Sequence, residues 1–221
     1  MKISDIIKQR IKDEGGKFFA NDNISKYINS GELELLQAEV EDKLQGVLES
    51  LIIDTENDHN TKETAKRVAK MYIQEVFKGR YTPAPRITDF PNSKQLDELY
   101  ILGPITIRSA CSHHLVPIIG KVWIGVLPDT NVIGISKFNR IIDWVMSRPH
   151  IQEEAVIMVA DELEKLMNPK GLAVYMKAQH MCMTWRGVKE AETEMINSIM
   201  RGEFKTNSSL KQEFLSFVNQ R

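Results

Sequence analysis

The chain has 221 residues, of which 42% are hydrophobic and 27% charged, and this composition is ordinary for a globular protein with one large domain or a domain and an extension. Its 29 basic and 30 acidic residues leave a formal net charge of −1, which argues against a general nucleic-acid binder because such proteins usually carry a basic excess. No apolar run approaches the ~20 residues that span a bilayer, and the charged start of the chain lacks a signal-peptide core, so we expect a cytoplasmic protein with no membrane partner.

The first part of the chain is predicted to be helical. A glycine pair interrupts a short helical pattern near the start, so residues 1–29 are predicted to form a loosely attached N-terminal arm. Apolar residues at spacings of three and four predict a helix over residues 33–51, and a second helix is expected after Asn60, which can cap it. Three prolines then mark a connector, so residues 30–92 are predicted to be a helical region followed by that connector.

The remaining part, residues 93–221, is predicted to alternate pairs of strands with helices. The expected elements, in order, are strands over 99–109 and 121–127, helices over 136–145 and 149–167, strands over 172–178 and 181–186, and a helix over 210–218. Paired strands with segregated helices predict the α+β class with an antiparallel sheet.

Both cysteines of the chain lie near a histidine. Cys111 is followed by Ser-His-His, ending at His114, and Cys182 comes two residues after His180. Thiolates and imidazoles are ligands that zinc prefers, and two cysteines with one histidine and an open position for water would form a catalytic site. Cys182 lies 71 residues beyond Cys111, so the fold must bring it in. From spacing alone two other interpretations stay open: buried, inert thiols, or the less favoured Cys111–Cys182 disulfide.

Two further histidines, His113 and His180, would be left over if the metal kept a water molecule. A histidine beside a zinc site can donate or accept a proton, because its unperturbed pKa is near ~6.5. Zinc can lower the pKa of its water to ~7. Such a pairing would suit a hydrolase that acts on an electrophilic carbon.

A cluster of candidate anion-binding residues lies at the start of the predicted helix over 136–145. Ser136 and Lys137 would lie by free backbone N–H groups that favour an anion, and Arg140 could present a fork to phosphate. Arg186, four residues after Cys182, adds a cation near the candidate metal site. The alternative is an ordinary helix cap followed by solvated basic side chains.

Gln152 and Glu153 lie in the first turn of the next predicted helix. Acidic residues are common at helix N-termini, so this position needs no functional explanation. The functional alternative is recognition of a purine, because a carboxylate can accept hydrogen bonds from the paired N–H donors of guanine. On the second predicted helix, Arg67 and Lys70 would ordinarily belong to a solvated face.

Four segments, taken together and in order, resemble the GTP cyclohydrolase I family over about residues 30 to 220. They are Cys111-Ser112-His113-His114, Val132–Arg140, Arg148–Glu153 and His180–Gly187, and the segment Glu63–Tyr72 is also similar. At three positions the chain differs from frequent family residues: Ser112 replaces Glu, Ala65 replaces Pro, and His150 replaces Gln. None of the three removes a candidate ligand.

The resemblance implies the tunnelling fold, with a four-stranded antiparallel sheet, two helices between its strand pairs, and preceding N-terminal helices. It implies a homo-oligomer, typically a decamer of two pentamers, with active sites at subunit interfaces. It implies a hydrolase in which zinc-activated water attacks C8 of GTP, giving formate and 7,8-dihydroneopterin triphosphate. This is a first step of pterin and tetrahydrofolate-type biosynthesis.

The same resemblance implies roles for individual residues. Those roles are zinc ligation by Cys111, His114 and Cys182, proton transfer by His113 and His180, contact with the triphosphate by Ser136, Lys137, Arg140 and Arg186, further contact by Arg67 and Lys70 of a neighbouring subunit, and guanine recognition by Gln152 and Glu153. Two alternatives remain. One is a related tunnelling-fold enzyme on another purine or pterin, although relatives that reduce a nitrile use a nucleophilic cysteine without zinc. The other is a non-catalytic module that binds GTP and zinc without forming formate.

Overall fold

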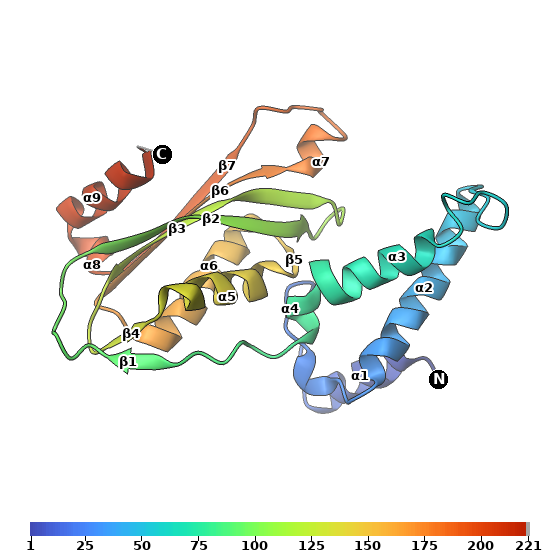
Figure 1. Cartoon of the computed structure of the whole chain (residues 1–221), viewed down its shortest axis with the longest axis horizontal. Helices are drawn as coiled ribbons and strands as arrows, with labels where there is room; N and C mark the ends of the chain where they lie inside the picture. Colours follow the sequence, from blue (N-terminus) through green and yellow to red (C-terminus); the bar gives the residue numbers. More distant parts are fainter. Residues whose placement is uncertain (220–221) are drawn as a thin grey trace. The chain divides into compact units, whose positions relative to one another are not determined.

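The computed structural model describes residues 1–219, and the chain folds as two compact units that divide between Pro83 and Ala84 (Figure 1). No helix in this described part is long and apolar enough to cross a lipid bilayer. The expected division at residues 29/30 and 92/93 stays a prediction.

The first unit is helical. Its elements are α1 (Ile3–Asp13), the 3-10 turn η1 (Ser25–Tyr27), α2 (Glu32–Ser50), α3 (Thr64–Lys70), the π-helical segment η2 (Met71–Val76) and α4 (Lys78–Tyr81). A small core holds them together, made of Ile7, Ile11, Ile24, Tyr27, Leu36 and Ile73. The prediction that Asn60 caps the second helix was wrong, because its amide instead donates to the carboxylate of Asp58 at 3.1 Å and α3 begins four residues later.

Helix α1 is fixed to α2 by two polar contacts. Arg10 donates to both carboxylate oxygens of Glu32 at 2.5 and 2.6 Å, and this contact lowers the pKa of Glu32 to about 2. Ser4 donates through its backbone N–H and its hydroxyl to Glu39, at 3.0 and 2.7 Å. Ile7 of the same helix is buried in the core of this unit, so together with the polar contacts it gives the start of the chain a defined place.

The second unit is mixed. Its elements are β1 (Asp89–Pro91), β2 (Tyr100–Cys111), β3 (Pro117–Leu127), β4 (Asn131–Ile133), α5 (Ile135–Met146), β5 (Pro149–His150), α6 (Gln152–Met167), β6 (Gly171–His180), α7 (Met181–Thr184), β7 (Met195–Gly202), α8 (Glu203–Thr206) and α9 (Ser208–Asn219). The main sheet has the order β5-β2-β3-β6-β7, and β1 pairs with β4 in a separate two-stranded sheet. Neighbours in the main sheet are antiparallel except for β5, which pairs in parallel with β2.

The predicted α+β class is confirmed, but the main sheet has five strands rather than four. The additional strand β5 arises because Pro149 and His150 pair with the end of β2, opposite Ala110 and Cys111. The fourth predicted helix therefore begins at Gln152, not at Pro149.

The prediction of a strand over residues 181–186 was wrong. Residues 181–184 form α7, a single helical turn that the backbone N–H of Trp185 closes by donating to the carbonyl of Met181 at 2.9 Å. The partner of β6 is β7, which starts only at Met195. Cys182 consequently lies on a tight turn just beyond the sheet.

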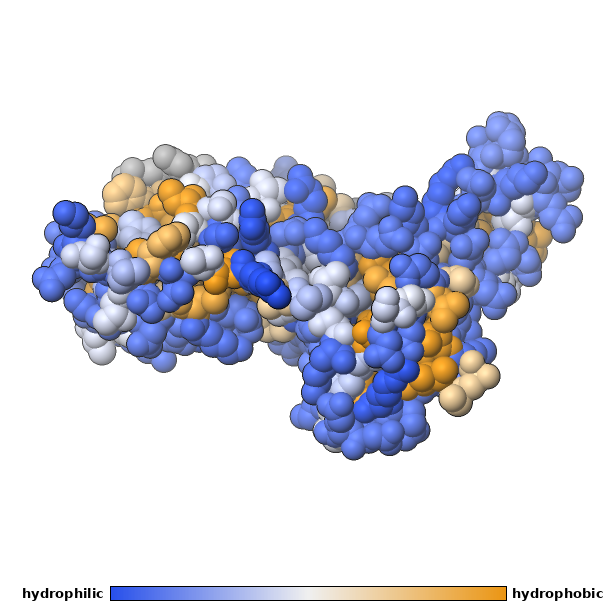
Figure 2. Space-filling model, turned by 60° about the horizontal axis from the view of Figure 1, so that its bottom comes forward, coloured by the Kyte–Doolittle hydropathy of each residue, from blue (hydrophilic) through white to orange (hydrophobic). Residues whose placement is uncertain are grey.

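The two faces of the main sheet are covered differently (Figure 1). Helices α5 and α6 cover one face, where side chains such as Val122 and Ile124 join the largest buried cluster. On the other face, α8 and α9 cover one end, where Trp123 packs in a smaller cluster with Phe204 and Phe214. Apolar side chains nevertheless reach the surface in both units, among them Leu35 and Val47 of α2, Leu51 just after α2, and Trp185 and Val188 after α7. Figure 2 shows apolar side chains, in orange, at the surface of the face that it draws.

Candidate metal centre

Three candidate ligands converge at one end of the main sheet. The sulfur atoms of Cys111 and Cys182 and one ring nitrogen of His114 all lie within 4.8 Å of one another. Both cysteines are free thiols, so the structure does not contain the alternative disulfide. A metal-ligand group therefore forms from residues that are 71 positions apart in the sequence.

Strand pairing explains why Cys182 lies beside Cys111. Strand β2 ends at Cys111, a short turn carries His114, and β3 then pairs with β6 so that Ile118 lies opposite His180. Helix α7 follows directly after His180, which places it at the same end of the sheet as that turn. The turn itself is closed by hydrogen bonds between Cys111 and Val116 and between Leu115 and Cys111, each 2.8 Å long.

The local electrostatics of this group suit a divalent cation. Burial raises the pKa of the Cys182 thiol, and the adjacent Cys111 adds to that effect, while Arg186 opposes it. Two adjacent thiolates repel each other. A bound metal ion stabilises both of them, because it is the largest local charge in such a site. Two sulfurs and one imidazole nitrogen match a three-ligand zinc site with an open position.

His180 is joined to the start of α6 and the start of β7. Its Nε2 lies 2.8 Å from Oε1 of Gln152, whose Nε2 donates to the carbonyl of Met195 at 2.9 Å. Burial lowers the pKa of His180, and the nearby carboxylate of Glu153 acts in the opposite direction. His180 is thus half-buried, and the Gln152 side chain that contacts it is itself hydrogen-bonded to the backbone of Met195.

His114 and its neighbours are more exposed. Nη1 of Arg186 donates to Nε2 of His114 across 3.1 Å, which joins a cation to the candidate ligands. The His113 ring meets the His114 ring edge to face, with centroids 6.3 Å apart. Both histidines are exposed, so His113 can contact a molecule bound over the metal group.

The anion cluster forms at a different place in the same unit. Ser136, Lys137 and Arg140 lie on the first turns of α5, after the N-cap residue Gly134, which has no capping side chain. A 12-residue helix is about 18 Å long, and Figure 1 shows that α5 runs from β4 toward β5, the strand that pairs with Cys111. Ser136, Lys137 and Arg140 therefore lie in the first half of α5, toward β4 rather than toward β5.

The other predicted substrate contacts fall into two groups, one at the metal end of the main sheet and one in the first unit. Glu153 is exposed at the metal end of the sheet, and no hydrogen bond or ion pair of its carboxylate is found within residues 1–219. Arg67 and Lys70 are exposed on α3, in the first unit, where Arg67 pairs with Glu63 at 3.6 Å.

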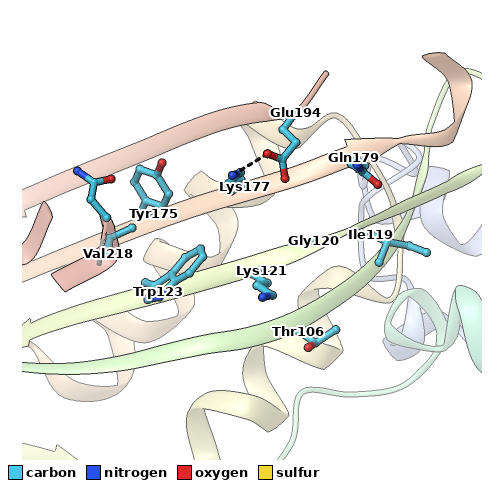
Figure 3. A pocket seen from close by; sticks show the side chains of 11 residues that line it. Thr106, Ile119, Gly120, Lys121, Trp123, Tyr175, Lys177, Gln179, Glu194 and Val218 are labelled. Atoms are coloured by element: carbon cyan, nitrogen blue, oxygen red, sulfur yellow. Dashed lines mark ion pairs between the residues drawn. The ribbon is translucent and has the colours of Figure 1, made fainter. Parts of the chain in front are cut away.

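A separate hollow of about 480 Å³ lies on the open face of the sheet (Figure 3). It contains none of the three candidate ligands, and Lys121 and Lys177 lie directly opposite each other there on β3 and β6. Lys177 pairs with Glu194 at 2.6 Å. These features are those of the solvated face of an antiparallel sheet, so we do not assign the chemistry to this hollow.

Sequence reasoning missed the internal contacts of Gln152. A signal for them was present, because Gln152 is the first member of the buried stripe of α6, which continues with Ala155, Val156 and Val159 at helical spacing. Its burial, 1% exposed, follows from that spacing. The role of Met195 could not be found in this way, since only its backbone carbonyl takes part.

The comparisons with known proteins agree on one family. The model of the family described as GTP cyclohydrolase I matches residues 40–219. The chain is 34% identical to GTP cyclohydrolase 1 of Haemophilus ducreyi over 203 residues, which cover 89% of this chain and 93% of that protein. The corresponding protein of Flavobacterium johnsoniae is 32% identical over 212 residues, or 93% and 94% of the two chains. That of Edwardsiella ictaluri is 37% identical over 183 residues, or 82% and 83%.

Similarity to a solved structure is weaker. The crystal structure of the archaeosine synthase QueF-Like in the apo form matches 47% of this chain and 93% of that chain, with 18% identity and a TM-score of 0.40. A likeness at this level does not bear on the fold or the function.

Proposed function

The chain belongs to the GTP cyclohydrolase I family, and on that premise we propose how its own residues convert GTP and water into 7,8-dihydroneopterin triphosphate and formate. This reaction belongs to pterin and folate-type biosynthesis. The observation that carries the proposal is the convergence of Cys111, His114 and Cys182 within 4.8 Å at the end of the sheet where His180 and Glu153 also lie.

Cys111, His114 and Cys182 would hold a zinc ion. Three ligands leave a fourth position open, which is typical of catalytic rather than structural zinc. When bound, zinc supplies a Lewis acid and lowers the pKa of water to about 7, so that a nucleophile for C8 of GTP is available at neutral pH.

Proton transfer falls to His113 and His180. Opening the imidazole ring of guanine, releasing C8 as formate and closing the pterin ring each require protons to be moved. His180 is half-buried and positioned by Gln152, which suits a group that must act in one fixed geometry. His113 is exposed next to His114, which suits exchange of protons with solvent and substrate.

Substrate recognition needs an anion site and a guanine site. Glu153 is free to accept two hydrogen bonds from the N–H donors of guanine, which adenine lacks at that edge. Arg186 is the one predicted triphosphate contact that lies against the metal group in this chain. Ser136, Lys137 and Arg140 offer the uncapped start of α5, where phosphate oxygens are favoured by backbone N–H groups and the helix dipole.

We propose that a second copy of the chain supplies this second set of contacts. Ser136 and Arg140 lie in the first half of α5, away from the end that leads to β5, which supports a site that another subunit completes. Exposed apolar side chains on α2 and after α7, such as Leu35 and Trp185, are consistent with burial between copies. We therefore propose the tunnelling fold, assembled as a decamer of two pentamers, with Arg67 and Lys70 reaching a neighbour's site.

Two measurements on purified, zinc-loaded protein test the proposed function. Formate release from GTP, and a fluorescent pterin after oxidation of the product, are expected in equal amounts. Consumption of another purine nucleotide in place of GTP would contradict the substrate assignment. Binding of GTP and zinc without formate would identify the non-catalytic alternative.

A further inference from the structure

Gln152 uses both ends of its side-chain amide inside the protein. It is the first residue of α6 and is 1% exposed. Its Nε2 donates to the carbonyl oxygen of Met195, the first residue of β7, at 2.9 Å, and its Oε1 lies 2.8 Å from Nε2 of His180. The amide therefore connects three elements at the metal end of the sheet.

This arrangement determines which nitrogen of His180 carries the proton. A backbone carbonyl can only accept, so the amide NH₂ group must face Met195 and the amide oxygen must face His180. An amide oxygen cannot donate, so the hydrogen in the second contact belongs to Nε2 of His180. In a neutral imidazole the other nitrogen, Nδ1, then holds the lone pair.

We propose that Gln152 is a positioning residue, which holds His180 as the Nε2–H tautomer and leaves Nδ1 to accept protons. The inference rests on the proposed function, in which His180 moves protons, and it assigns Gln152 a different role from the guanine recognition expected from the sequence. A tautomer fixed by a neighbouring hydrogen bond spares the histidine a rearrangement before each transfer.

Gln152 and Glu153 differ both in burial and in hydrogen bonding. To read guanine, the Gln152 amide would have to leave Met195 and His180, and each of those groups would lose a hydrogen bond. Glu153, one residue on, is exposed, and within residues 1–219 its carboxylate has no hydrogen bond or ion pair to give up. Guanine recognition therefore falls to Glu153, while Gln152 acts through His180.

Because the Gln152 amide also bonds to Met195, the His180 tautomer depends on the position of the first residue of β7. The loop between α7 and β7 is held at its end by Gln152 and by the pair of Lys177 with Glu194. Gln179, next to His180 on β6, also donates to this loop, at Ala191 over 3.4 Å. Substitution of Gln179 removes this one loop contact and leaves both hydrogen bonds of Gln152 in place, which provides a matched control.

The first experiment is solid-state ¹⁵N NMR of protein labelled with ring-¹⁵N histidine, in the metal-free and zinc-loaded forms at pH ~8, where an unperturbed histidine is neutral. The chain has five histidines, and His180→Gln identifies the His180 signals by their loss. In the wild type we expect a protonated Nε2 and an unprotonated Nδ1. Gln152→Met should give a mixture of tautomers, and Gln179→Met should keep the wild-type pattern.

The second experiment separates positioning from substrate recognition by steady-state kinetics with GTP. For Gln152→Met we expect kcat to fall ~10-fold or more while KM changes less than ~3-fold and the zinc content is unchanged. Gln179→Met should have kinetic constants close to those of the wild type. Glu153→Gln should instead raise KM.

The outcomes are distinct. A wild-type His180 with its proton on Nδ1, or an unchanged tautomer in Gln152→Met, would overturn the inference even if the enzyme is active. A raised KM with unchanged kcat in Gln152→Met would return Gln152 to guanine recognition. If the protein formed no formate from GTP, the proposed function would fail, while the NMR result would still decide the tautomer. The wild-type spectrum alone also remains decisive if Gln152→Met does not fold.

Discussion

Arg186 donates a hydrogen bond to Nε2 of His114 over 3.1 Å, so a predicted substrate contact and a predicted metal ligand share one nitrogen. A neutral imidazole has a single in-plane lone pair, and in this structure Arg186 uses it. A metal ion bound through either ring nitrogen needs that same lone pair. Metal binding must therefore release Arg186, which becomes available for an anion.

The shared nitrogen predicts that removal of Arg186 strengthens zinc binding. Arg186→Ala removes both a competing hydrogen bond and a nearby positive charge, so zinc affinity should rise about 5- to 10-fold, the equivalent of one ordinary hydrogen bond. Competition with a chelator measures this affinity. Arg140→Ala is the matched control, because Arg140 lies on α5 and should leave zinc affinity as it is. Equal or weaker zinc binding in Arg186→Ala would show that the contact does not compete with the metal.

The same substitution should weaken substrate binding. Loss of a charge-assisted contact with phosphate predicts a KM for GTP raised about 10-fold or more in Arg186→Ala. Arg186→Lys retains the charge but not the planar fork, so its KM should lie between those of the wild type and the alanine variant. Kinetics on zinc-saturated protein measure the effect without interference from metal loss. A KM equal to that of the wild type would remove Arg186 from the triphosphate site.

Cys182→Ser should lose zinc and activity together. A serine hydroxyl does not ionise at neutral pH as a metal-bound thiol does, so zinc should fall from roughly one ion per chain to a small fraction of that value. Metal analysis and formate release are measured on the same preparation. Met183→Leu, one residue on and exposed, serves as the control and should keep both. Continued turnover without zinc would contradict the catalytic-metal assignment.

Local patterns in the sequence were enough to predict the helices that cover the sheet. In α5, Phe138, Ile141, Ile142 and Val145 repeat at helical spacing and all four are buried. The adjacency of cysteine and histidine likewise indicated the three residues that converge at the metal centre. These features are local, or depend on residue types with few alternative roles.

What the sequence did not reveal depends on tertiary pairing. Strand β7 alternates exposed and half-buried residues at one end of the sheet order, and 52% of Ile196 is exposed, so its pattern does not stand out from a loop. Helix α7 has only four residues, which is too few for a period to be visible. Pro149 suits both a helix start and an edge strand, and only its pairing with Ala110 decides between them.

Gly125 should be essential for the packing of α9 on the sheet. A Cβ atom at this position would lie 2.7 Å from Cδ2 of Phe214. The Phe214 ring is fully buried and packs edge to face on Phe204, with the ring centroids 5.9 Å apart. Gly125→Ala should lower the free energy of unfolding by about 1–3 kcal/mol through this overpacking. Gly46→Ala is the control, because its Cβ would meet nothing within 4 Å in the middle of α2, where alanine favours the helix. Urea unfolding compares the two. A Gly125→Ala variant as stable as the wild type would contradict the tight packing.

His150 should make the stability of the protein depend on pH. It is fully buried on β5, its Nε2 donates to the carbonyl of Val145 at 2.7 Å, and no described residue pairs with its Nδ1. Burial lowers the pKa of His150 to about 4, against an ordinary value of 6.5. Between these values the unfolded chain binds a proton that the folded chain does not, so the contribution is complete above pH 6.5 and is lost as the pH falls toward 4. From pH 7.5 to 5 this predicts a loss of about 2 kcal/mol.

His150→Gln isolates this contribution. Glutamine can still donate to the carbonyl of Val145 but does not titrate, so the pH dependence contributed by His150 should disappear while that of all other groups remains. Urea unfolding of both proteins, kept metal-free with a chelator so that loss of zinc at low pH does not interfere, gives the two stability curves. The difference between them should be constant above pH 7 and should fall by about 1.4 kcal/mol per pH unit below pH 6. Parallel curves down to pH 5 would mean that His150 titrates normally and that its burial does not limit its protonation.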